Sequence, residues 1–149
     1  MEQKKNKPVA GKPDFWHQLK IAKRGEPIFV LAPMADVTDA AFRQLIAKYS
    51  RMGQSGGGPD VMWTEFVSAD GLALAPKEGR NKLLRDLVFT AAERPIVAQF
   101  FSAHPENMEK AAQLAVEMGF DGIDINMGCP HKSIDKQCAG AAMMKNPKL

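Results

Sequence analysis

The stretch RPIVAQFFSAHPENMEKAAQLAVEMGFDGIDIN, residues 94–126, predicts one complete strand–helix–strand unit. Residues 96–100 form an apolar run rich in strand-forming side chains, and Pro105 suits the first turn of a helix. Gly119 is well placed to end that helix, and residues 122–126 predict the next strand. Between these ends, apolar side chains recur at helical spacing on one face, namely Met108, Ala111, Ala112, Ala115 and Met118.

The same alternation extends towards the N-terminus. Residues 28–32 are a continuous apolar run, and such runs are typical of strands that are buried on both faces. Thr38 or Asp39 can cap a following helix, whose predicted apolar face comprises Ala41, Leu45 and Ile46. Further predicted elements are a short helix over residues 15–24, a strand over 61–64 and a small-residue helix over 68–74. Repeated strand–helix units predict right-handed crossovers and a parallel sheet.

The ends of the predicted strands favour a barrel over a dinucleotide-binding fold. No glycine-rich fingerprint follows the first strand, and the glycines of residues 52–59 lack its spacing. Polar and special residues instead follow the strand ends, where a (β/α)8 barrel builds its active site. A whole barrel needs eight strands and about 250 residues. We therefore expect an α/β fold, a partial TIM (β/α)8 barrel of the first four βα units over residues 14–149, from the N-terminal half of a longer protein.

Composition excludes several classes of protein. The chain has 149 residues, of which 45% are hydrophobic and 25% charged, with a net charge of +3. These values are typical of globular domains and argue against disordered, collagen-like and membrane-spanning chains. Residues 1–13 predict a flexible basic arm, which is either simply solvated or weakly attracted to phosphate. The N-terminus lacks the apolar core of a secretory signal, so we expect a cytoplasmic protein.

The two cysteines are too few for a disulfide scaffold and lack metal-ligand spacing, so no metal site is expected. Cys129 lies between Gly128 and Pro130 in a loop beyond a strand end, and is either a small buried hydrophobe or a catalytic group. A thiol with the ordinary pKa of about 8.5 keeps its proton at neutral pH, which suits a general acid better than a nucleophile. His131 is close enough in sequence to activate it in principle. Cys138 has no comparable setting, and we interpret it as structural.

Asp124 and Asn126 are expected on the same side of the last strand, because strand side chains alternate. Buried polar side chains need partners or water. Asn126 has donors and acceptors for a planar heterocycle, although both residues can also serve only to satisfy neighbouring loops.

Several motifs then resemble one family in order and spacing. LAPMADVTDAAFR, TEFVSADGL, residues 94–130 with their closing GCP, and AGAAMMKNP are similar to the N-terminal barrel half of tRNA-dihydrouridine synthases. The resemblance implies a flavoenzyme that uses NADPH and bound FMN to reduce the C5=C6 bond of a uridine in tRNA. It implies that Cys129 protonates C5. The other residues that it implies are Pro33, Met34, Ala35 and Gln99 for the flavin, Asn126 for the target base, and Lys132 and Lys136 for RNA phosphate.

Some features leave alternatives open. Lys132 and Lys136 can equally be solvated loop charges, and the resemblance assigns no clear role to Glu65. Residues 52–59 are longer than the family's usual connection, and Cys138 stands where glycine or alanine is common. The family's flavin-phosphate loops and helical tRNA-binding domain have no counterpart in these residues, so we expect the chain to be inactive alone. The alternatives are a flavin barrel acting on a free pyrimidine, similar to dihydroorotate dehydrogenases, and a non-catalytic half-barrel used in RNA binding or assembly.

Overall fold

The computed structural model describes residues 15–54 and 56–148; the predicted basic arm, 1–13, lies outside them. The described chain folds into alternating strands and helices. In order, these are α1 (Phe15–Lys23), β1 (Val30–Leu31), α2 (Ala40–Tyr49), β2 (Val61–Ser68), α3 (Ala69–Leu74), α4 (Lys77–Asp86), η1 (Ala91–Glu93), β3 (Ile96–Phe101), α5 (Pro105–Met118), β4 (Gly122–Ile125), α6 (Lys132–Asp135) and η2 (Gly140–Lys145).

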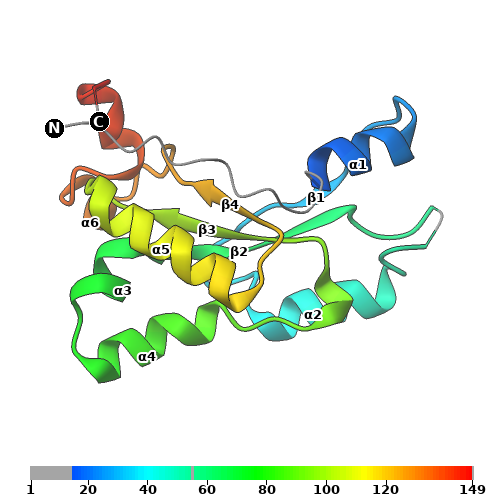
Figure 1. Ribbon diagram of the computed structural model, residues 1–149, viewed down its shortest axis with the longest axis horizontal. Helices are drawn as coiled ribbons and strands as arrows, with labels where there is room; N and C mark the ends of the chain where they lie inside the picture. Colours follow the sequence, from blue (N-terminus) through cyan, green and yellow to red (C-terminus); the bar gives the residue numbers. More distant parts are fainter. Residues whose placement is uncertain (1–14, 55, 149) are drawn as a thin grey trace, which may run out of the picture.

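The four strands form one parallel sheet in the order β1-β2-β3-β4. Helices α2, α4 and α5 cover one face of the sheet, whereas α1 lies on the other face (Figure 1). Neighbours in sequence are thus neighbours in the sheet, as in successive βα units of a barrel. The predicted α/β class is confirmed: the sheet is open and consistent with part of a TIM barrel.

The alternation of side chains along β3 separates the core from the site. Ala98 and Phe100 are fully buried and pack against Ala111 and Ala115 of α5. Gln99 points to the opposite face of the sheet, the face that carries no covering α2, α4 or α5. The prediction for α5 is confirmed at both ends, since Gly119 ends the helix with a left-handed φ of 81°.

A bulge in β2 gives the strand an extra residue. Trp63 pairs with Val97, and Phe66 pairs with Gln99. Between these two pairs β2 advances by three residues and β3 by only two. Trp63 and Phe66 consequently face the same side, although an odd spacing would normally place them on opposite faces. The strand is also longer than the four residues predicted, since it continues to Ser68.

The expectation that the first strand is buried on both faces is wrong. Only Val30 and Leu31 pair with β2, while Phe29 is 64% and Val30 47% exposed. The cause is their position at a free edge of the sheet. The other edge strand, β4, likewise exposes Ile123 and Ile125.

The inward face of helix α2 matches the predicted one only in part, because Ile46 packs against the buried cluster of Ala47, Met62 and Ile96 but Ala41 is exposed. Asp39 caps it by accepting from the Phe42 N–H at 2.7 Å, as expected. Leu45, however, is 55% exposed, whereas Arg43 is fully buried. Burial of Arg43 is possible because the equally buried Glu93 of η1 accepts from its Nε at 2.7 Å.

Helices α4, α6 and η1 were not predicted. The longest helix of the described residues, α5, has 14 residues, and none of the described helices has the length and apolar character needed to cross a bilayer.

Candidate functional site

Gln99 is the centre of a hydrogen-bonded group on the open face of the sheet. Gln99 is 6% exposed, and its side chain lies between two polar neighbours, one in β4 and one directly after it. Nε2 of Gln99 donates to Oδ2 of Asp124 at 2.6 Å, and Nδ2 of Asn126 donates to Oε1 of Gln99 at 3.1 Å. We call Asp124, Gln99 and Asn126 the amide network. Both ends of the Gln99 amide are therefore engaged inside the protein.

Asn126 joins the amide network to the loop that carries Cys129. Its Oδ1 accepts from the backbone N–H of Gly128 at 3.2 Å and of Cys129 at 3.0 Å. Its own N–H donates to the carbonyl of Phe100 at 2.8 Å, which extends the ladder between β3 and β4 by one step. The expectation that Asp124 and Asn126 share one side of the strand is confirmed, since both contact Gln99.

Cys129 is half-buried and is held by its backbone on both sides. Besides the bond from its N–H, its carbonyl accepts from the N–H of Ala141 at 3.0 Å. Its side chain packs against a buried cluster of Phe101, Ile134 and Ala139. Gly140 passes so close that a Cβ there would lie 2.5 Å from the Cys129 carbonyl oxygen, so this position requires glycine.

His131 is turned away from the role of activating base. Its Nδ1 contacts Oγ of Ser133 at 2.7 Å and accepts from the Ser133 N–H at 3.3 Å, so it caps α6. Within the described residues, no hydrogen bond joins it to Cys129.

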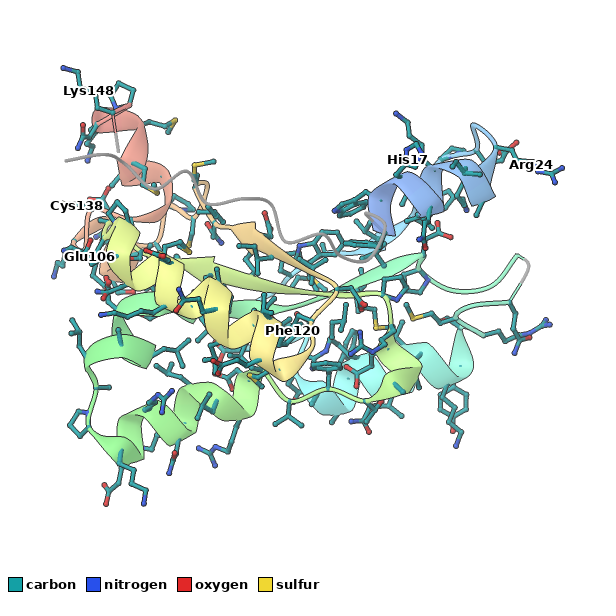
Figure 2. The ribbon with its side chains drawn as sticks, viewed as in Figure 1. His17, Arg24, Glu106, Phe120, Cys138 and Lys148 are labelled. Carbon is teal, nitrogen blue, oxygen red and sulfur yellow. The ribbon has the colours of Figure 1, made fainter. Side chains whose placement is uncertain are left out.

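Cys138 lies outside the packed cluster around Cys129. It is exposed and has a left-handed φ of 57°, a conformation that favours glycine. Figure 2 shows Cys138 and Lys148 at the end of the molecule opposite to His17 and Arg24. The carboxyl ends of the strands point towards this Cys138 end (Figure 1).

Pro33, Met34 and Ala35 form a pre-ordered turn after β1. The buried hydroxyl of Thr38 accepts from the N–H of Met34 at 3.0 Å and donates to its carbonyl at 3.1 Å. Met34 and Ala35 remain exposed. A planar ligand at this end of the sheet can therefore meet a backbone whose shape is already fixed.

Glu65, in the bulge, ties this turn to β2 by accepting a hydrogen bond from the N–H of Asp36. Burial raises the pKa of Glu65 above its usual range, and that hydrogen bond only partly opposes the effect. The carboxyls of Asp86, Asp36 and Asp39 raise it further. Glu65 thus holds its proton at a higher pH than an ordinary glutamate does.

Lys132 begins α6 and Lys136 caps its C-terminal end. Both are exposed, and their spacing of four residues places them on the same side. In the described residues neither forms an ion pair, whereas nearby Lys145 contacts Asp135 at 3.3 Å. These two charges are available to an anionic partner.

A second polar cluster lies between the ends of β2 and β3. Oδ1 of Asp70 accepts from Ser102 Oγ at 2.7 Å and from Asn107 Nδ2 at 2.8 Å, and it lies 3.1 Å from Nδ1 of His104. Burial opposes ionisation, but these three hydrogen bonds outweigh it and hold the pKa of Asp70 below its usual range. No metal-binding group of three or more His, Cys, Asp or Glu side chains occurs among the described residues.

The sequence did not reveal two contributors to the site. The buried hydroxyl of Thr64 accepts from the backbone N–H of Gln99 at 3.2 Å, and Nε1 of Trp63 donates to Asp124 at 3.2 Å. Thr64 lies in the bulge of β2, which strand periodicity cannot indicate because the bulge interrupts it. Trp63 pairs regularly with Val97, and its contact with Asp124 joins residues 61 positions apart, which the sequence does not indicate.

The sequence is similar to those of known proteins. The model of the family described as dihydrouridine synthase (Dus) matches residues 30–149. The chain is 37% identical over 136 residues to a probable tRNA-dihydrouridine synthase 2 of Bacillus subtilis (strain 168), covering 91% of this chain and 38% of that protein. It is 35% identical over 138 residues to a probable tRNA-dihydrouridine synthase of Staphylococcus aureus (strain COL), covering 93% of this chain and 38% of that protein. The chain thus spans about 38% of the length of these curated relatives.

Proposed function

The chain belongs to the dihydrouridine synthase family, and we propose that its residues 14–149 supply the first four βα units of an FMN-binding barrel that reduces uridine in tRNA with NADPH. The curated relatives are named as probable tRNA-dihydrouridine synthases. The observation that carries the proposal is the continuous series of hydrogen bonds from Gln99 through Asn126 to the backbone of Cys129. It joins a group suited to a flavin ring, a group suited to uracil and a proton donor.

The residues present fit the ring of FMN. The Gln99 amide uses one Nε2 hydrogen and one Oε1 lone pair inside the amide network, which leaves one donor and one acceptor for a heterocycle. The turn of Pro33, Met34 and Ala35 offers an ordered backbone at the same end of the sheet. We assign the flavin ring to these four residues.

Cys129 is the proposed general acid. When bound and reduced by NADPH, FMN would supply a hydride to the C6 carbon of uracil. The Sγ–H bond of Cys129 breaks as its proton passes to C5, so that one hydride and one proton saturate the C5=C6 bond. The resulting thiolate regains a proton from solvent. Packing against Phe101 and Ile134 shields the thiol from part of the solvent before the transfer.

Asn126 and the two lysines are the proposed RNA contacts. One hydrogen on Nδ2 of Asn126 is not used by Gln99 and can donate to a uracil carbonyl. Lys132 and Lys136, exposed and on one side of α6, suit backbone phosphates that flank the target uridine.

A chimera tests the proposal. This chain replaces the matched 38% of the Bacillus subtilis relative, and the purified chimera is incubated with NADPH and tRNA that lacks dihydrouridine. We expect bound FMN and dihydrouridine formation that the Cys138→Ala variant retains. A folded chimera that binds FMN and oxidises NADPH but leaves every tRNA uridine unreduced would contradict the proposed function.

A further inference from the structure

The amide network has one consistent orientation. An amide presents nearly the same shape either way round, so its donors and acceptors decide how it lies. The backbone N–H groups of Gly128 and Cys129 can only donate, and therefore Oδ1 of Asn126 must face them. Nδ2 of Asn126 then faces Gln99, whose Oε1 accepts. Nε2 of Gln99 is left to donate to Oδ2 of Asp124.

We infer that Asp124 is a positioning residue whose carboxylate fixes both amides and, through them, the loop that carries Cys129. Oδ2 of Asp124 accepts from Gln99 at 2.6 Å and from the Trp63 indole at 3.2 Å, so one oxygen anchors two donors. The bearing of Asp124 on catalysis rests on the proposed function, in which Gln99 contacts flavin and Asn126 contacts uracil. The role of Asp124 in ordering the Gln99 and Asn126 side chains is independent of the proposed function.

This inference is tested by exchanging the acid and the amide at residues 124 and 126, which reverses the direction of the hydrogen bonds through Gln99. In Asn126→Asp, residue 126 keeps an oxygen for the loop N–H groups but turns a second oxygen towards Oε1 of Gln99. Gln99 cannot turn round to donate to it, because Asp124 holds its Nε2. Adding Asp124→Asn frees the amide: the new Nδ2 donates to Gln99 Oε1, and Gln99 donates to residue 126. The Trp63 indole loses its acceptor in this variant, because it shares Oδ2 of Asp124 with Gln99 in the original chain, so the double variant restores the amide network without the Trp63 contact.

The measurement is a double-mutant cycle on the 149-residue chain. The folding equilibrium constant is obtained from urea unfolding of the original chain, Asp124→Asn, Asn126→Asp and the double variant. We expect Asn126→Asp to lower this constant about tenfold more when Asp124 is present than when it is replaced, as for other residues of one hydrogen-bond network. Hydrogen exchange at the Cys129 backbone N–H should quicken in Asn126→Asp and slow again in the double variant.

A matched background separates orientation from simple charge repulsion between residues 124 and 126. Gln99→Met keeps a side chain of similar length without amide groups, so we expect the tenfold coupling to fall to about twofold or less there. A coupling that is absent with Gln99, or unchanged with Met, would overturn the inference. If Asn126→Asp does not fold, folding of the double variant supports the inference, and failure of both overturns it. No flavin or RNA is involved, so failure of this cycle is distinct from failure of the proposed function.

Discussion

Cys129 is fixed in the loop by its backbone, not by its thiol. Its N–H and carbonyl are both hydrogen-bonded, to Asn126 and Ala141, and neither bond depends on the side chain. Replacing the thiol therefore removes chemistry with little change of loop position. This separation makes the residue a clean target for mutation.

For Cys129→Ala in the chimera, we expect uridine reduction to slow about 10²–10⁴-fold, the usual cost of losing a positioned general acid. Reduction of FMN by NADPH should stay near its original rate, because that step needs no proton at C5. Stopped-flow absorbance follows the two half-reactions separately, with the exposed Cys138→Ala as control. Equal slowing of both half-reactions would remove Cys129 from the role of proton donor.

Gln99→Ala should weaken FMN binding more than tRNA binding. Loss of a buried hydrogen bond costs about 1–3 kcal/mol, or roughly 5- to 150-fold in affinity. Flavin fluorescence titration and gel-shift assays on the chimera measure the two affinities. Gln113→Ala on the exposed side of α5 serves as the control. If FMN affinity stays unchanged, Gln99 has only a structural role.

Asp70 should make stability depend on acidic pH. Its pKa is lowered in the folded chain relative to about 3.8, so the unfolded chain binds the proton more readily. The stabilisation from its ionised form is present above pH 3.8 and is lost as pH falls below that value through the folded pKa. We expect the difference in unfolding free energy between the original chain and Asp70→Asn to shrink over this range. Asn107→Ala, which removes one donor to Asp70, should weaken the dependence, and a pH-independent difference would contradict the assignment.

At the scale of elements, the buried pair of Arg43 and Glu93 holds α2 against η1. Arg43 also donates to the carbonyls of Thr38 and Val88, and Glu93 accepts from the N–H of Thr90 at 2.7 Å. Every polar group of the pair therefore has a partner. The same arginine supports the turn after β1, because Thr38 is the residue that orders that turn.

Removing one partner of this pair should destabilise the chain by about 3–5 kcal/mol, since it leaves a buried charge uncompensated. We expect this loss for Glu93→Leu in urea unfolding. The double variant Arg43→Met/Glu93→Leu should be less destabilised than the sum of the single variants. Strict additivity would show that the two side chains do not stabilise each other.

Elements with regular periodicity were predictable, and those shaped by tertiary contacts were not. Helix α5 was predicted from Pro105 to Gly119 because its apolar spacing and both end signals agree with its packing. Arg43 was missed because a charged side chain is buried only when a distant partner neutralises it, and the sequence does not indicate that Glu93 lies opposite. The exposure of β1 was missed because an apolar run does not reveal whether another strand covers it.

The candidate site follows the same rule. Gln99, Asn126 and Cys129 were selected by their positions after strand ends, and the structure brings them together. Thr64 was missed because it lies in the bulge of β2, where strand periodicity is interrupted, and Trp63 because its partner, Asp124, is distant in sequence.

At the scale of the whole molecule, the four-stranded sheet leaves a flavin only partly enclosed. The phosphate of a barrel-bound cofactor usually lies at the loops after strands seven and eight. The described residues contain four strands, and the groups suited to FMN all address its ring. We therefore expect the 149-residue chain alone to bind FMN weakly and not to form dihydrouridine. Size-exclusion chromatography with added FMN measures this, and a monomer that elutes with stoichiometric yellow cofactor would contradict it.

The two free edges of the sheet also make the thermal stability of the chain depend on the concentration of any molecule that binds them. Val30 and Leu31 at one edge, and β4 with Ile123 and Ile125 at the other, offer parallel strands that another strand can extend. Any molecule that pairs with these edges binds only the folded chain, so it raises the midpoint of thermal unfolding in proportion to the logarithm of its concentration. If the molecule is a second copy, the chain becomes its own stabilising ligand. Its melting temperature then rises with protein concentration. If copies pair at both edges, each added copy presents a new free edge, and the assembly continues to grow.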